Sequence, residues 1–159
     1  MKKKILILSV ITFSFIYLIA QSKKEVKKFK IKMVTVMETT DGVAVNEGKT
    51  VYDKSGEVIE EVTYTKEGSL KTIHKYKLNK KGDVVEETEY DGNNKMKEKK
   101  EVKYNAMGEK AEELFYGSDS KLFKKHLFSY NNQGLKTEKK TQDGNGKLIS
   151  AKKYTYSYL

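Results

Sequence analysis

The sequence contains no cysteine, proline, tryptophan or arginine in its 159 residues. Without cysteine, disulfides, thiolate metal sites and the lipid attachment of bacterial lipoproteins are excluded. Without arginine, the chain lacks the planar group that binds bases and phosphates through two parallel hydrogen bonds. Its 32 basic residues are all lysines, and 22 acidic residues leave a net charge of +10. Lysines interleaved with glutamates are typical of a solvated surface, so we expect no nucleic-acid partner.

One long apolar run is present, at residues 5–20, directly after three lysines. A basic start, an apolar run and the small residue Ala20 at its end are typical of a secretory signal peptide. The alternative is an uncleaved anchor, but the 16 residues reach only about 24 Å as a helix, short of the ~30 Å hydrocarbon core. We therefore expect a signal helix over residues 1–20, membrane contact through it before cleavage, and a secreted, periplasmic or cell-surface location.

The remaining chain divides into a polar leader at residues 21–28, which we expect to be mobile, and one β-repeat domain at residues 29–159. Residues 29–38 begin with apolar and lysine side chains in alternation, which predicts a strand. A second strand follows the Asp41-Gly42 turn and is interrupted at residues 46–48, so a bulged strand and a short hairpin are both open. No helix is expected after residue 22.

A repeated unit begins at residues 51–91: a tyrosine, a polar turn with glycine, an apolar residue, and a charged strand to the next tyrosine. The tyrosines are Tyr52, Tyr64, Tyr76, Tyr90, Tyr104, Tyr116 and Tyr130, with Gln142 and Tyr156 at the next two positions. Every interval is 12 or 14 residues. Because strand side chains alternate with period two, we expect these even intervals to keep all the tyrosines on one face.

Each unit supplies one strand and one turn, so successive strands run antiparallel. With the two leading strands, we predict an all-β fold: an antiparallel meander of about ten strands built from 12–14-residue repeats. Charged residues such as Glu60 and Lys100 stand mid-strand on either face. Burying unpaired charges costs several kcal/mol each. We therefore expect a largely single-layer or curled sheet with a thin core, covered by cross-strand lysine–glutamate pairs.

Residues 52–58 (YDKSGEV) resemble the YD repeat of Rhs-type proteins, and residues 64–70 (YTKEGSL), 104–108 (YNAMG) and 130–134 (YNNQG) are similar, degenerate copies. The tyrosine–glycine rhythm is equally similar to MORN-like repeats. The resemblance covers residues 50–159 and implies β-hairpin sheets in a short secreted bacterial protein. Carbohydrate binding has been proposed for some members of the family, but the resemblance implies the class of scaffold and little about the ligand. The chain departs from the Rhs pattern because it has no arginine after the glycine and no toxin domain.

The sequence offers little catalytic chemistry. His74 and His126 are its only histidines, and they fall four predicted strands apart, roughly 19 Å at ~4.8 Å per strand. Adjacent acids such as Glu60 and Glu61 point to opposite faces of a strand, so they cannot form an acid–base pair. We expect no enzyme activity, no cofactor and no metal site. A secreted hydrolase would need one of the histidines in a cleft with an acidic partner within hydrogen-bond reach.

Two turns are rich in oxygen atoms, at residues 91–94 (DGNN) and 143–146 (DGNG). Such loops bind calcium in some proteins. Neither continues into a twelve-residue calcium loop, and a lysine follows each directly. We therefore favour simple turn chemistry for both.

We hypothesise that the protein is an exported, non-enzymatic scaffold that acts as a binding or structural module at the cell envelope. A glycan is the preferred ligand. The candidate ligand-contact row consists of Tyr52, Tyr64, Tyr76, Tyr90, Tyr104, Tyr116, Tyr130 and Tyr156. The simpler interpretation of these tyrosines is that they pack the thin core with their hydroxyls in water. The alternative function is a protein-interaction module, an adaptor or immunity-type partner, that uses its sheet edges.

Overall fold

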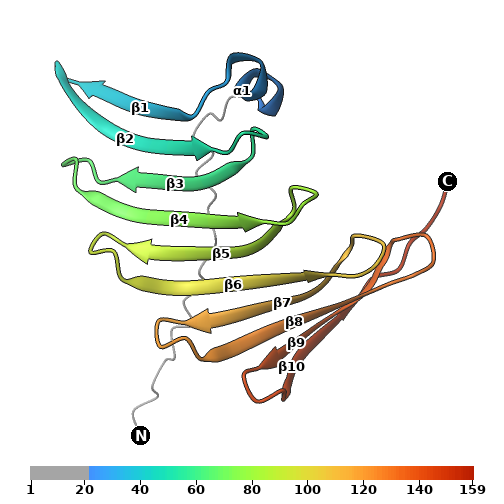
Figure 1. The fold of residues 1–159 in the computed structure, drawn as a ribbon. Helices are drawn as coiled ribbons and strands as arrows, with labels where there is room; N and C mark the ends of the chain where they lie inside the picture. The colour runs from blue at the N-terminus through green and yellow to red at the C-terminus, as the bar shows by residue number, and fades with distance from the viewer. Residues whose placement is uncertain (1–21) are drawn as a thin grey trace, which may run out of the picture.

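The computed structural model describes residues 22–159, so the predicted signal helix lies outside the described residues. Ten strands form one open antiparallel sheet, and each pairs with the strand next to it in sequence (Figure 1). The strands are β1 (Met33–Thr40), β2 (Val43–Tyr52), β3 (Val58–Tyr64), β4 (Leu70–Leu78), β5 (Val84–Asp91), β6 (Met96–Tyr104), β7 (Lys110–Gly117), β8 (Leu122–Tyr130), β9 (Lys136–Asp143) and β10 (Leu148–Lys153). The predicted ten-stranded meander is confirmed.

The sheet forms a single layer. Within residues 22–159, the extensive contacts between elements all join neighbouring strands. The buried apolar residues of the sheet are few: Tyr52, Val62, Val102, Leu114 and Phe115. They are divided between the two faces of the sheet. The thin core expected from mid-strand charges is therefore confirmed.

A short helix, α1 (Lys23–Phe29), stands where we expected a mobile leader and the start of a strand. Ser22 caps its first turn by accepting from the Glu25 backbone, while the Glu25 side chain accepts from the Ser22 backbone. This reciprocal capping box stabilises a helix start. Val26 is 1% exposed, so the helix buries one apolar side chain. The Ser22–Glu25 spacing is the signal that predicts this helix, and our expectation of no helix was wrong.

The second strand is continuous, which settles the choice left open by its interruption. In the β1–β2 pairing, Val36 pairs with Gly48 and Met37 with Asn46, so Glu47 is the extra residue of a β-bulge. The first strand starts at Met33 rather than at Phe29, since the helix occupies the preceding segment.

The true repeat is 26 residues long and contains two strands. Residues with positive φ recur at this interval in two series: Gly56, Gly82, Gly108 and Gly134, then Gly68, Asn94, Ser120 and Gly146. The two series mark the turns at the two ends of the strands (Figure 1). The intervals of 12 and 14 are therefore the two unequal halves of one hairpin unit.

Most turns share one hydrogen-bond pattern. In the turn that follows β6, Asn105 Oδ1 accepts from the backbone nitrogens of Met107 and Glu109 at 3.0 and 2.9 Å. The same pattern occurs at Asp53, Asn79, Asp91, Asn131 and Asp143. A side-chain oxygen that bonds to the backbone two and four residues on is a common way to stabilise a tight turn.

Candidate functional site

Strand pairing defines the two faces of the sheet, because directly paired residues lie on the same face. Glu61 pairs with His74, and His74 pairs with Glu89. We call their side the histidine face. The opposite side carries Leu114 and its partner Glu101, and we call it the Leu114 face. The described residues form no second layer over either face.

One charged or titratable side chain from each of the strands β3 to β10 lies near the centre of the histidine face. They follow one another at intervals of 13 residues: Glu61, His74, Glu87, Lys100, Glu113, His126, Lys139 and Lys152. We call this set the central ladder. Acidic and basic groups alternate along it as far as His126, and the last two members are both lysines. The ladder is therefore balanced over β3–β8 and positive over β9 and β10.

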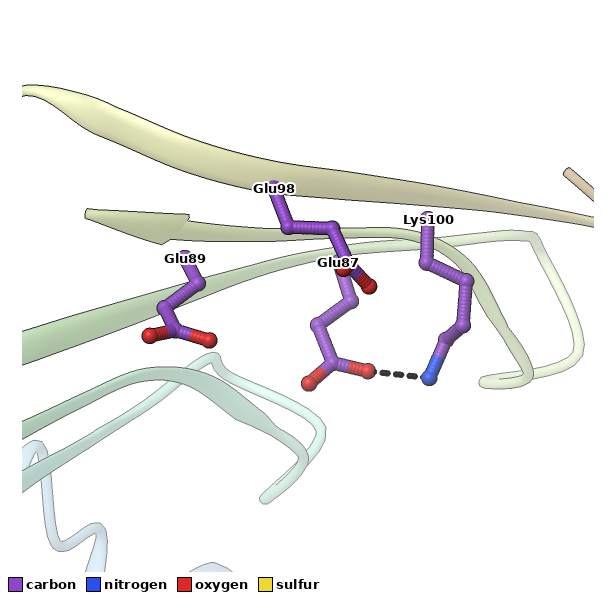
Figure 2. A pocket seen from close by; sticks show the side chains of 4 residues that line it. All are labelled: Glu87, Glu89, Glu98 and Lys100. Carbon is purple, nitrogen blue, oxygen red and sulfur yellow. Dashed lines mark hydrogen bonds and ion pairs between the residues drawn. The ribbon is translucent and has the colours of Figure 1, made fainter. Parts of the chain in front are cut away.

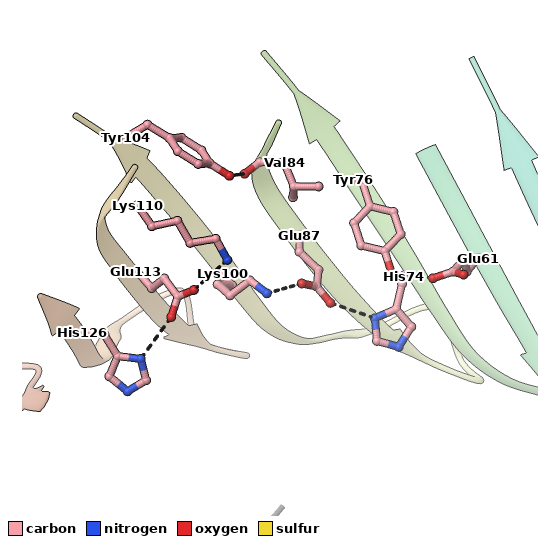
Figure 3. A network of polar contacts seen from close by, with 10 residues as sticks. All are labelled: Glu61, His74, Tyr76, Val84, Glu87, Lys100, Tyr104, Lys110, Glu113 and His126. Atoms are coloured by element: carbon pink, nitrogen blue, oxygen red, sulfur yellow. Dashed lines mark hydrogen bonds and ion pairs between the residues drawn. The ribbon is translucent and has the colours of Figure 1, made fainter. Parts of the chain in front are cut away.

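In the first half of the ladder, Glu87 joins two basic groups (Figure 3). His74 Nδ1 lies 3.5 Å from Glu87 Oε1, and Lys100 Nζ donates to Glu87 Oε2. Burial disfavours the charged form of Glu87, but the bonds to His74 and Lys100 outweigh it and lower the pKa of Glu87 to about 2. The same Glu87 bond raises the pKa of His74, against burial and with help from Glu89 and Glu61. His74, Glu87 and Lys100 therefore form one ion-pair network in which each charge stabilises its neighbour.

A shallow hollow on the histidine face is lined by Glu87, Glu89, Glu98 and Lys100 (Figure 2). Glu89 and Glu98 pair directly across β5 and β6. Burial raises the pKa of Glu98, Lys124 opposes this, and the Glu89 charge adds to it. Among residues 22–159, no three histidine, cysteine or acidic side chains are grouped so that they could hold a metal ion.

Both histidines have the acidic partner that a hydrolase would require. His126 Nδ1 lies 3.2 Å from Glu113 Oε2, and Lys110 Nζ lies 3.2 Å from the other oxygen of Glu113. Neither histidine, however, lines the hollow of Figure 2. In Figure 3 the two pairs lie apart along the ladder, in β4–β5 and in β7–β8. Their arrangement suits cross-strand ion pairing.

The second half of the histidine face combines lysines with aromatic rings. Lys124 Nζ lies 4.1 Å from the centre of the Phe115 ring. Lys136 and Lys139 lie 4.8 and 5.7 Å from the centre of the Phe128 ring. Such distances allow cation–π attraction, which holds the ammonium groups in position over the rings. We call Phe115, Lys124, Phe128, Lys136, Lys139 and Lys152 the basic patch.

The tyrosines form two rows instead of the single row we expected. One row consists of Tyr52, Tyr104 and Tyr130, with Leu78 in the equivalent place and Tyr156 continuing it beyond β10; the other consists of Tyr64, Tyr90 and Tyr116. The rows run along opposite ends of the strands. Tyr76 belongs to neither, because it stands two residues before Leu78, and it donates to Glu61 instead.

The two rows also lie on opposite faces, so the prediction of one shared face was wrong. In β6 and β7, Lys100 pairs with Phe115 and Lys99 with Tyr116. Tyr104, four residues after Lys100, is on the histidine face, whereas Tyr116 is on the Leu114 face. Along the part of each strand before its bulge, from β2 onward, even-numbered residues thus pair with odd-numbered residues of the next strand. An even interval therefore changes face between neighbouring strands and restores it only after two.

The tyrosines are also less accessible than a ligand platform needs. Tyr52 is 5% exposed and Tyr156 is 44% exposed; the other six are half-buried. Three hydroxyls donate to a backbone carbonyl: Tyr104 to Val84, Tyr130 to Lys110 and Tyr156 to Lys136. Sequence reasoning assigned the candidate site to these residues and missed the central ladder, although its 13-residue spacing is visible in the sequence.

The comparisons with known proteins identify no family, since no family model matches the chain and no curated protein matches its sequence. Similar solved structures include TarM, with 19% identity, a TM-score of 0.33, and coverage of 79% of this chain and 22% of TarM. A Bacteroides fragilis protein of unknown function has 10% identity, a TM-score of 0.44 and coverage of 80% and 95%. A porin-like protein from Bacteroides uniformis has 14% identity, a TM-score of 0.37 and coverage of 70% and 53%.

The chain thus spans about a fifth of the length of TarM. Similarities at this level transfer no function to this chain. In residues 22–159, no helix has the length and apolar character required to span a membrane.

Proposed function

We propose that this protein is an exported, non-enzymatic β-repeat scaffold that binds a glycan of the cell envelope across its histidine face. The observation that carries the proposal is the uncovered face itself. A sheet of ten strands in one layer leaves a broad, open surface, and β7–β10 add lysine ammonium groups held over aromatic rings to it. Open surfaces of this kind suit extended polymers better than small substrates, which favour enclosed pockets.

The tyrosine row that first suggested a glycan does not carry this proposal, because it is split between two faces and mostly half-buried. The basic patch takes its place. Its rings belong to Phe115 and Phe128 on β7 and β8, and its polar groups come from β8, β9 and β10.

The test is retention of the full chain on insoluble cell-wall material and on a panel of purified envelope polysaccharides. We expect at least one polysaccharide to bind with a Kd of about 1–100 μM, the affinity of a modest polar interface. The test variant is Lys139→Glu, which reverses one charge of the basic patch and should be retained more weakly than the wild-type protein. Retention of neither protein on any polysaccharide would overturn the proposal.

The second candidate is a protein-interaction module that uses the β10 edge. All six residues of β10 are exposed, and Leu148 and Ile149 are 53% and 62% exposed. An open edge strand with exposed apolar side chains can pair with an added strand from a partner. Ile149→Lys should block such pairing, whereas Val43→Lys, at an equally exposed position beside the other edge, should not. Equal effects of the two changes on partner binding would contradict this candidate.

A further inference from the structure

Positive charge is concentrated in the last four strands. From residue 110 to residue 153 the sequence has ten lysines against five acidic residues. Each of the last three strands contains two consecutive lysines: Lys124 and Lys125 in β8, Lys139 and Lys140 in β9, and Lys152 and Lys153 in β10. In each pair, the first lysine lies on the histidine face and the second on the Leu114 face.

On the histidine face, these lysines crowd one another. Lys139 pairs directly with Lys152 across β9 and β10, and with Phe128 across β8 and β9. Burial lowers the pKa of Lys139, Glu113 opposes this, and the charges of Lys152, Lys136 and Lys124 lower it further. Like charges placed directly opposite on a sheet are destabilising unless a counter-charge is supplied.

The acidic groups on this part of the face are already engaged. Glu113 bonds to His126 and to Lys110. Asp143 pairs with Lys124 in the β8–β9 register, but its Oδ1 accepts from the backbone nitrogens of Asn145 and Lys147 at 3.0 and 2.9 Å. Glu98 on β6 is a further acid, and its charge interacts with Lys124. Within β8–β10 themselves, internal counter-charge is therefore short on this face.

The ring of Phe115 holds Lys124 in place and does not offer a stacking surface of its own. Phe115 is 6% exposed and is covered by Lys124 on one side and the His126 ring at 4.9 Å. A base or sugar ring cannot reach it. What the patch presents to a ligand is a row of positioned ammonium groups across adjacent strands, which are about 4.8 Å apart.

We propose that the basic patch binds an anionic polysaccharide that lies across β8, β9 and β10, with its acidic groups paired to Lys124, Lys139 and Lys152. This inference rests on the proposed function and names the class of glycan. The missing counter-charge is the reason for an anionic ligand. An extended polymer is favoured because the ammonium groups are spread over three strands on an open surface. A nucleic acid is disfavoured because the patch has no arginine, the side chain that binds bases and phosphates through two parallel hydrogen bonds.

The experiment compares two triple variants of the full chain. Lys124→Gln/Lys139→Gln/Lys152→Gln removes the lysines of the histidine face. Lys125→Gln/Lys140→Gln/Lys153→Gln removes the next residue of each strand, with the same change in net charge, from the Leu114 face. Binding to polygalacturonate, dextran sulfate, neutral dextran and a thymidine oligonucleotide is measured by calorimetry at two salt concentrations, and folding is checked by circular dichroism.

We expect polygalacturonate and dextran sulfate to bind the wild-type protein and neutral dextran not to bind. The histidine-face variant should bind at least about tenfold more weakly, the control variant by less than about threefold, and wild-type affinity should fall steeply with salt because counter-ions are released. If the histidine-face variant does not fold, the wild-type salt dependence and the preference for anionic over neutral dextran decide.

Four outcomes would overturn the inference. They are equal losses in the two variants, equal binding of neutral dextran, tighter binding of the oligonucleotide than of either polysaccharide, and a histidine face occupied by a second copy of the chain, seen as a dimer in sedimentation that the polysaccharides do not dissociate. Binding of a neutral envelope glycan that is independent of these lysines would overturn only this inference and leave the proposed function standing.

Discussion

His126 lies two repeat units after His74, and each imidazole faces a glutamate on a neighbouring strand, yet the pKa values of the two histidines move in opposite directions. Hydrogen bonding to Glu87 raises the pKa of His74, whereas burial lowers the pKa of His126, and Lys139 and Lys124 oppose its protonation against the effect of Glu113. The two histidines have different neighbours along the ladder. His74 stands between Glu61 and Glu87, whereas His126 stands between Glu113 and Lys139, so a lysine replaces one of the two acidic neighbours.

The first prediction concerns pH. Because the pKa of His74 is raised in the folded state, its ion pair contributes stability that is fully present below the ordinary histidine pKa of 6.5. This stability is lost as the pH rises through the folded-state pKa. The free-energy cost of His74→Gln should therefore be larger at acidic than at alkaline pH. Urea unfolding across this range measures it.

His126→Gln is the matched control for that experiment. Its folded-state pKa is lowered, so protonation of His126 costs stability as pH falls below 6.5. The cost of His126→Gln should therefore shrink toward acidic pH. Parallel pH profiles for the two variants would contradict the assignment of opposite shifts.

The second prediction concerns Glu87, which is 8% exposed. Glu87→Gln leaves the partly buried Lys100 without its carboxylate, and we expect it to destabilise the fold by about 1–3 kcal/mol at neutral pH. Glu86→Gln is the control, because Glu86 lies on the other face and pairs at 2.8 Å with a Lys77 that is 71% exposed. It should cost less than about 0.5 kcal/mol. Equal costs of the two changes in urea unfolding would show that an ion pair in the central ladder contributes no more stability than one on the other face.

The third prediction concerns Leu78, which occupies a tyrosine position of the 26-residue repeat. Tyr104 and Tyr130 donate to carbonyls that precede them by 20 residues, and the equivalent acceptor for residue 78 is the carbonyl of Val58. Leu78→Tyr should add this hydrogen bond and stabilise the protein by about 0.5–1.5 kcal/mol. Leu78→Phe, which lacks the hydroxyl, should not; a thermal melt of both variants distinguishes them.

The fourth prediction concerns the turns. Ser120 has a φ of 61° where most units have glycine. An L-residue in this left-handed conformation costs about 1–2 kcal/mol, so Ser120→Gly should raise the free energy of unfolding by about 1 kcal/mol. Asn94→Gly, at the same place in the preceding unit with a φ of 61°, should gain less because asparagine tolerates this conformation. A loss of stability for Ser120→Gly would contradict the strain.

The fifth prediction concerns calcium. The Oδ1 atoms of Asp91 and Asp143 each accept two backbone hydrogen bonds within their turns. We expect the melting temperature to stay unchanged as calcium is added up to about 1 mM, because a cation that bound the folded state would raise it. A rise that Asp143→Asn abolishes would show that the turn holds the ion.

Local patterns in the sequence predicted much of the fold. Residues such as Gly56 and Asn105 mark turns by their own backbone and side-chain chemistry, and alternation along each strand is visible between them. The capping box of Ser22 and Glu25 is equally local and predicts the one helix that our expectation omitted. These features depend on residues within a few positions of one another, so they can be recognised without a structure.

The sequence by itself therefore determined the number of strands, their meander order and the single layer, because turn residues and mid-strand charges leave few other arrangements. Only the tertiary structure decided which side chains share a face. That depends on the register across each bulged hairpin, where one extra residue, such as Ile59 opposite Val51 and Tyr52 or Ala111 opposite Lys103 and Tyr104, moves the pairing by one. This register separates the tyrosines into two rows and aligns Glu61, His74 and Glu87 into a ladder, since cross-strand neighbours are set by pairing between strands and not by spacing along the chain.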